Sequence, residues 1–146
     1  FLLQWGAFGS GDGQFNAPTG IAVAPTGEVY VSDTFNRRIQ KFTENGGFLL
    51  KWGSLGSGDG QFSSNGLSGL SVGPDGSVYA GDNILHRVQK FSASGAFILL
   101  WSASRPINTT VSPDGNTIYV AENAAGRVRA FDPAGILNPG RYVDGI

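Results

Sequence analysis

Three acidic residues and three arginines recur at matching places along this 146-residue sequence, and they are its first candidates for chemistry. Each acidic residue ends an apolar run, and an arginine follows a short turn later. The pairs are Asp33 with Arg38, Asp82 with Arg87, and Glu122 with Arg127. A carboxylate that faces an arginine across a tight turn forms a charge-assisted hydrogen bond. A ring of carboxylates could instead hold a cation, but because the pair recurs in every copy of the pattern, we interpret it as structural.

His86 is the only histidine in the sequence, and there is no cysteine. His86 aligns with Arg37 in one copy of the pattern and with Gly126 in another, so the position accommodates charge. We expect an exposed side chain there rather than a catalytic base or a metal ligand, because a zinc site needs several ligands. The lack of cysteine excludes disulfides and thiolate metal sites. No nucleophile–base–acid set stands outside the repeats, and we therefore expect no catalysis, metal or cofactor.

Two glycine-rich segments, Gly9–Phe15 and Gly56–Phe62, have identical sequences. A phosphate cradle would need a helix or a lysine after the glycines, and a calcium loop would need several oxygen-bearing side chains at alternate positions. Each segment offers a single aspartate and neither of those features. We therefore interpret the segments as connections between neighbouring sheets, in which Phe15 and Phe62 fill the gap between them.

Four short strand-like runs recur in each copy of the pattern, and these elements must position the candidates above. They are rich in β-branched and aromatic residues and are bounded by turn-forming residues. The first runs are Gly20–Val23, Gly69–Val72 and Thr109–Ser112; the second are Val29–Ser32, Val78–Gly81 and Ile118–Ala121; the third are Arg38–Phe42, Arg87–Phe91 and Arg127–Phe131; the fourth are Phe48–Trp52 and Phe97–Trp101. Four short antiparallel strands repeated every ~40–50 residues describe a β-propeller blade. The sequence therefore predicts an all-β fold with about three blades.

The residues that join these runs resemble the NHL repeat. The pattern is Gly-Gln-Phe, then Pro-x-Gly-Ile-Ala-Val, then Gly-x-Val-Tyr-Val-Ser-Asp, then Asn-Arg-Arg-Ile-Gln-Lys-Phe, then Gly-x-Phe-Leu-x-x-Trp-Gly. Residues 1–101 resemble it closely and residues 106–135 loosely, because the third copy lacks Gly-Gln-Phe and has Glu122 in place of the aspartate. The resemblance implies a β-propeller, usually six-bladed, of which this chain would supply half. Members of that family are mostly binding and scaffold modules, although a few relatives are enzymes, including a metal-dependent lyase of amidated-peptide precursors.

The chain starts and ends inside a blade. We expect one domain over 1–146, with a donated outer strand at 1–6, blade 1 at 7–53, blade 2 at 54–101 and an incomplete blade 3 at 102–146. Phe1–Trp5 resembles the fourth strand Phe48–Trp52, but no first three strands precede it. At the other end, Ile136–Gly140 is a poor fourth strand because Pro139 lacks the N–H that a ladder needs.

These two ends predict self-association. Three blades leave a blade face at each end and an open edge on the third, and bare strand edges pair with other chains. We expect the first residues of one molecule to pair with the last strand of another. The contacts would join Phe1, Leu2, Leu3 and Trp5 with Arg127, Val128 and Phe131. Two molecules would then form a closed six-bladed homodimer, whereas onward donation would give a head-to-tail fibre.

Tryptophan recurs in the fourth strand as Trp5, Trp52 and Trp101. Because the recurrence follows the blade period, we interpret these residues as packing between outer strands. The alternative is a surface for a carbohydrate or peptide, since aromatic side chains also form ligand platforms.

Charged residues are sparse, at 14% against the roughly 25% of an ordinary soluble domain. The lysines and arginines are scattered, whereas nucleic-acid binding needs clustered positive charge, so we expect no nucleic-acid partner although some NHL relatives bind RNA. No apolar run approaches the ~20 residues of a membrane span, so we expect no membrane partner. Low charge with abundant Gly, Ser, Thr and Asn favours an extracellular protein. Asn108 begins the only Asn-x-Thr motif, which we treat as a chance occurrence.

Two functions from different classes follow. The first is a non-catalytic structural or protein-interaction module that self-associates, with a protein or carbohydrate as a further ligand. The alternative is a ligand-binding or lyase-type enzyme with its site at the mouth of the propeller channel. The loops there would contribute Phe35, Asn36, Leu85 and His86.

Overall fold

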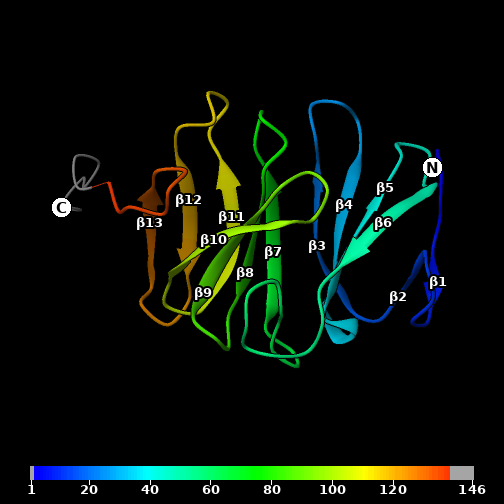
Figure 1. Ribbon diagram of the computed structural model, residues 1–146, viewed down its shortest axis with the longest axis horizontal. Helices are drawn as coiled ribbons and strands as arrows, with labels where there is room; N and C mark the ends of the chain where they lie inside the picture. Colours follow the sequence, from blue (N-terminus) through cyan, green and yellow to red (C-terminus); the bar gives the residue numbers. More distant parts are fainter. Residues whose placement is uncertain (1, 139–146) are drawn as a thin grey trace.

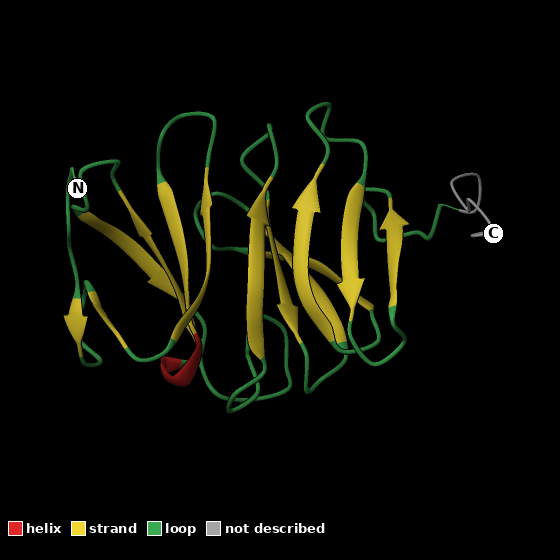
Figure 2. Ribbon diagram, turned by 180° about the vertical axis from the view of Figure 1, so that it is seen from behind, coloured by secondary structure: helices red, strands yellow, loops and turns green. Residues whose placement is uncertain are grey.

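The computed structural model describes residues 2–138, which fold into β-strands joined by turns (Figures 1 and 2). Three antiparallel sheets follow one another along the chain, and we call them blades 1, 2 and 3. Blades 1 and 2 have four strands each, and blade 3 has three. The predicted all-β fold with about three blades is confirmed. Residues 2–138 include no helix of the length and apolar character needed to cross a membrane.

Within each blade the strands pair in chain order. Blade 1 contains β3 (Pro18–Val23), β4 (Val29–Asp33), β5 (Arg38–Phe42) and β6 (Phe48–Trp52); blade 2 contains β7 (Leu67–Val72), β8 (Val78–Asp82), β9 (Arg87–Phe91) and β10 (Phe97–Ser102); blade 3 contains β11 (Pro106–Val111), β12 (Ile118–Glu122) and β13 (Arg127–Phe131). A short parallel pair, β1 (Ala7–Phe8) with β2 (Gln14–Phe15), precedes blade 1, and a 3₁₀ turn, η1 (Thr34–Asn36), joins β4 to β5.

The first strand of each blade begins earlier than the sequence indicated. Each contains a register shift, which allows its first residue to pair with the acidic residue that ends the second strand. The pairs are Pro18 with Asp33, Leu67 with Asp82 and Pro106 with Glu122. The acidic residues are therefore the last residues of their strands.

The first strands of the three blades lie side by side and form the inner wall of the stack (Figure 1). Their close approach depends on glycine, because a Cβ built on Gly20 would lie 3.0 Å from the Cα of Gly69. A shallow hollow of about 290 Å³ follows this wall, lined by both apolar and hydroxyl side chains such as Ile21, Ser71 and Thr110. The wall corresponds to one side of the channel expected in a propeller.

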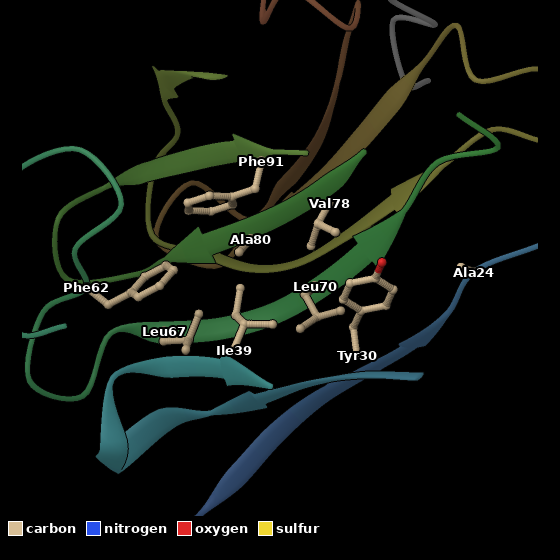
Figure 3. Close-up of a cluster of buried hydrophobic side chains, with 9 residues drawn as sticks. All are labelled: Ala24, Tyr30, Ile39, Phe62, Leu67, Leu70, Val78, Ala80 and Phe91. Carbon is tan, nitrogen blue, oxygen red and sulfur yellow. The ribbon is translucent and has the colours of Figure 1, made fainter. Parts of the chain in front are cut away.

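The hydrophobic core lies between the blades, because side chains alternate between the two faces of each sheet. In β4, Tyr30 points toward blade 2, while Val29 and Val31 point away from it. Figure 3 shows the cluster between blades 1 and 2, formed by Ala24, Tyr30, Ile39, Phe62, Leu67, Leu70, Val78, Ala80 and Phe91. A second cluster joins blades 2 and 3, formed by Tyr79, Val88, Trp101, Ala103, Ile118, Val120 and Phe131. Burying each large side chain contributes about 1.5–3 kcal/mol.

The glycine-rich segments lie between the outer strand of one blade position and the first strand of the next. Phe62 is fully buried, and its ring centroid lies 6.0 Å from that of Phe91. Phe15 lies 5.6 Å from Phe42 in the same way. Both phenylalanines fill the gap at the entry to a blade, as the sequence indicated.

Blade 3 begins a fourth strand of its own. A tight turn follows β13, and Leu137 then forms a bridge with Phe131 while the Asn138 N–H donates to the Ala130 carbonyl at 3.0 Å. Among the described residues this contact is a single bridge with one hydrogen bond, and the sheet of blade 3 keeps three strands. Pro139 and Gly140 lie outside the described residues. The Phe131 end of the edge is therefore already paired within the chain.

Candidate functional site

The carboxylate of Asp33 is the centre of a buried polar cluster in blade 1. Arg38 lies opposite it in the strand register, and the Arg38 Nε donates to Asp33 Oδ2 at 2.7 Å. The Asn36 side chain and the Asn16 N–H also donate to this carboxylate. The rest of the guanidinium donates to the carbonyls of Ser10, Gly11 and Gln14. The pair therefore clamps the glycine-rich segment onto blade 1, and this is a structural role.

Blade 2 does not form the equivalent direct bond. Asp82 faces Arg87 in register, but its carboxylate accepts hydrogen bonds from the Ser63 N–H and hydroxyl and from two turn N–H groups. Arg87 donates to the carbonyls of Ser57, Gly58 and Gln61, and its Nε is buried with no hydrogen-bond partner among the described residues. The expected carboxylate–arginine bond is thus corrected here, because Ser63 and the turn satisfy the carboxylate first.

In blade 3, Glu122 is held by two arginines. The Arg127 Nε donates to Glu122 Oε2 at 2.8 Å, Arg129 donates to the other oxygen, and the Ser104 N–H donates at 2.6 Å. Burial alone would raise the pKa of Glu122, but the hydrogen bonds from Arg129, Arg127 and the Ser104 N–H outweigh it and hold the pKa below its usual value. Arg129 was not singled out from the sequence. The sequence feature that could have identified Arg129 is its alignment with Gln40 and Gln89, because a charged residue replaces a neutral one there.

The four candidate channel-mouth residues lie in two turns, one between β4 and β5 and one between β8 and β9. Phe35 and His86 are exposed, whereas the Asn36 side chain is committed to Asp33 and to the Gly9 carbonyl. Leu85 is half-buried, and its N–H donates to Asp82. None of the four lines the inner-wall hollow or the groove described below. Within residues 2–138, no group of three or more His, Cys, Asp or Glu side chains is arranged to hold a metal ion.

The tryptophans of β6 and β10 pack between blades. The ring of Trp52 lies 5.7 Å from that of Phe91, and the ring of Trp101 lies 5.5 Å from that of Phe131. Each indole also lies against a glycine in a hairpin of the following blade. A Cβ on Gly95 or Gly135 would come within 2.7 Å of Trp52 or Trp101, respectively. These contacts join one blade to the next.

Trp5 takes the same position on blade 1. Its ring lies 6.2 Å from that of Phe42, and a Cβ on Gly46 would come within 2.6 Å of the indole. Residues 2–6 nevertheless pair with no strand in the described part of the chain, and Leu2 is fully exposed. Phe1 lies outside the described residues. Trp5 therefore packs on blade 1 as the tryptophan of an outer strand packs on the following blade, although residues 2–6 belong to no sheet of the described chain.

The two ends of the stack expose apolar faces. We call the side of a blade toward the preceding one its near face, and the opposite side its far face. On the near face of blade 1, Ile21 is 66% exposed, whereas Leu70 at the same position in blade 2 is 4% exposed. On the far face of blade 3, Val128 is 65% exposed, whereas the matching Val88 is 0% exposed. Neither blade 1 nor blade 3 has a neighbour on these sides in the described chain.

The near face of blade 1 is hollowed into a groove of about 520 Å³, which we call the blade 1 groove. Its lining includes Leu3, Trp5, Phe15, Pro18, Ile21 and Val31. The sequence predicted an open face at this end but did not single out Ile21 or Val31. Their alignment with the core residues Leu70 and Ala80 was the available signal.

The repeated geometry agrees with known families. Residues 15–42 match the family model described as the NHL repeat. Residues 15–42 are thus an NHL repeat by sequence. It is 44% identical over 48 residues to the B-box type zinc finger protein ncl-1 of Caenorhabditis elegans, a segment covering 33% of this chain and 6% of that protein. It is 50% identical over 46 residues to the human E3 ubiquitin-protein ligase TRIM32, covering 32% of this chain and 7% of that protein. The matched segments span less than a tenth of these relatives.

Solved structures support the β-propeller fold. Virginiamycin B lyase from Staphylococcus aureus superposes with a TM-score of 0.68 at 19% identity, covering 84% of this chain and 40% of the lyase. A streptogramin B lyase gives a TM-score of 0.66 at 20% identity, covering 81% of this chain and 38% of that lyase. At these identities the likeness concerns the fold alone.

Proposed function

We propose that this NHL-repeat chain is a non-catalytic protein-binding propeller module that self-associates by donating residues 2–6 as an outer strand. The observation that carries the proposal is the position of Trp5. Its indole packs on blade 1 as Trp52 packs on blade 2 and Trp101 on blade 3. The side chain is therefore ready for an outer strand whose sheet another chain can supply.

The register of the donated strand follows from the two complete blades. Trp52 pairs with Ile39, and Trp101 pairs with Val88. By the same register, Trp5 would pair with Val128 of a second copy. Leu137 and Asn138 already pair with Phe131 and Ala130 within the chain. The donated segment is therefore limited to Gln4–Gly6, and the segment that accepts it is limited to Arg127–Arg129. This is shorter than the pairing expected from the sequence.

Donation has two outcomes. Two copies that exchange strands close into a ring, and copies that donate onward form a fibre. The choice depends on the curvature of the stack, and both outcomes bury the edge of β13, which is the last strand of its sheet among residues 2–138. A protein or carbohydrate ligand would bind to the assembled propeller.

The experiment measures the mass of the purified chain by light scattering across a concentration series. A closed dimer gives twice the 15.3 kDa of one chain, and a fibre gives a ladder of larger species. Gln4→Pro should weaken association about tenfold or more, because proline cannot donate to a ladder and each tenfold corresponds to about 1.4 kcal/mol. Leu2→Pro, just outside the pairing segment, is the matched control. A monomer at every concentration would refute the proposal.

A further inference from the structure

We infer that the blade 1 groove is the docking surface for the far face of blade 3 of a second copy, with Val128 of one chain packing on Ile21 of the other. This inference rests on the proposed self-association and names its side-chain interface. Strand donation by itself requires only backbone pairing, so the two statements can fail separately.

The contact between blades 1 and 2 is the first template. Ile39 and Tyr30 on the far face of blade 1 pack into the cluster that contains Leu70 on the near face of blade 2 (Figure 3). Hydrogen bonds cross the same boundary. The Ser32 hydroxyl donates to the Ser68 carbonyl at 2.8 Å, and the Thr34 hydroxyl donates to the Leu67 carbonyl at 2.9 Å.

The contact between blades 2 and 3 repeats this arrangement. Val88 and Tyr79, which match Ile39 and Tyr30, pack against Ile118 and Val120 of blade 3. The Ser68 hydroxyl donates across the boundary to the Pro106 carbonyl at 2.8 Å. The chain therefore contains one interface twice, and each blade uses its far face to cover the near face of the next.

The two ends of the stack are the two unmatched halves of this interface. Val128 aligns with Ile39 and Val88, and Ile21 aligns with Leu70. In the single chain Val128 is 65% exposed and Ile21 is 66% exposed. The residues that align with them in the internal interfaces are buried. Joining the ends would continue the established interface a third time.

The character of the groove favours this occupant over a charged or hydrophilic ligand. Its lining residues include no charged side chain, and most of them are apolar. Leaving Ile21 in water forfeits about 1.5–3 kcal/mol relative to burial. A β-branched apolar residue is what fills the matching space in both internal interfaces, and Val128 is the same kind of residue.

The experiment uses charge exchange in the full chain. Ile21→Asp and Val128→Lys should each raise the dissociation constant of the wild-type assembly by about a hundredfold or more, because each places an unpaired charge in an apolar interface. In an equimolar mixture of the two variants, one interface pairs Asp with Lys and the other keeps Ile21 with Val128. Mixing should therefore restore association, most strongly at low salt.

Ile98→Lys is the matched control, because Ile98 is an exposed apolar residue on β10, the outer strand of blade 2. It should leave association unchanged. If the wild-type chain is monomeric, the proposed function fails together with this inference. If the wild type associates but Ile21→Asp and Val128→Lys associate equally well, or their mixture does not recover, only the face pairing is overturned.

A second measurement covers the case in which a charged variant fails to fold. The chain has no native cysteine, so Ile21→Cys and Val128→Cys copies each carry one thiol. A short thiol-specific crosslinker should join the mixed copies much faster than it joins Ile98→Cys with Val128→Cys. Equal rates would contradict the inference.

Discussion

Gly95 lies against the indole of Trp52, so that a Cβ at position 95 would come within 2.7 Å of the ring. The same contact joins Gly46 to Trp5 and Gly135 to Trp101. Gly95 also has a left-handed backbone, with φ of +83°. The hairpin glycine of each blade thus serves two purposes, since it forms the turn and it admits the tryptophan that precedes the blade.

Replacing this glycine should cost more than the turn alone explains. Gly95→Ala should lower the free energy of unfolding by about 2–3 kcal/mol, because it adds a clash with Trp52 to the left-handed strain. Gly76→Ala is the control, since Gly76 has φ of +82° but its Cβ would meet only Ala93 at an ordinary 3.4 Å. We expect a loss of about 1 kcal/mol for Gly76→Ala. Urea denaturation measures both, and equal losses would argue against the tryptophan contact.

The two aspartates that end β4 and β8 should differ in their dependence on charge. Asp33→Asn removes a buried carboxylate that Arg38 Nε contacts at 2.7 Å, and should cost about 3–5 kcal/mol. Asp82→Asn should cost about 1–3 kcal/mol, because an amide oxygen at the Oδ1 position can still accept from the Ile84 and Leu85 N–H groups, and only the Ser63 N–H loses its acceptor. Thermal and urea unfolding of the two variants would compare them. A larger loss for Asp82→Asn would contradict the assigned hydrogen bonds.

Most of the fold could be predicted from the sequence because each blade repeats the same local information. Alternating β-branched and aromatic residues, with Gly-containing turns between them, located the strands to within a few residues. The early starts of β3, β7 and β11 were not predictable in this way. These starts depend on register shifts within the strands. In β3 and β11 the shift pairs a proline, Pro18 or Pro106, with an acidic residue, and proline is uncommon inside a sheet because it has no N–H to donate.

The site was less predictable because its hydrogen bonds depend on which donors lie next to each carboxylate in the folded chain. The same Asp-to-Arg spacing gives a direct bond at Asp33 and none at Asp82. The difference comes from Ser63, which is outside the repeated motif. In the same way, Ile21 is exposed because no blade lies against it among residues 2–138, and its own residue type does not predict that exposure.

Glu122 should make the stability of the chain depend on pH. Its pKa in the folded chain is held below the ordinary value of 4.5, so the ionised form is favoured by folding. This contribution is therefore present above about pH 4.5 and is lost as the pH falls through the folded pKa. Glu122→Gln should be less stable than the wild type at pH 7, and the difference should shrink below pH 4.5. Unfolding free energies measured from pH 7 to 3 test this, and a constant difference would contradict it.

His86 stands at a position whose backbone favours glycine. Its φ is +54°, as is that of Arg37, and the third copy has Gly126 there with φ of +59°. A non-glycine residue with this positive φ lowers the stability of the fold by about 1–2 kcal/mol. Replacing it with glycine removes that strain, but part of the benefit is lost because glycine gives up more conformational freedom on folding. His86→Gly should therefore raise the free energy of unfolding by about 0.5–1 kcal/mol.

His86→Gly also removes a hydrogen bond, in which the His86 Nδ1 accepts from the Arg105 N–H at 3.2 Å. Its loss should cost little stability, because this hydrogen bond is exposed to solvent. His86→Ala is the control. Alanine keeps the left-handed strain and loses the hydrogen bond, so it should be neutral or slightly destabilising. Urea midpoints at neutral pH compare the three chains. If His86→Gly proves the less stable of the two variants, the imidazole has a structural role at this turn that outweighs the backbone strain.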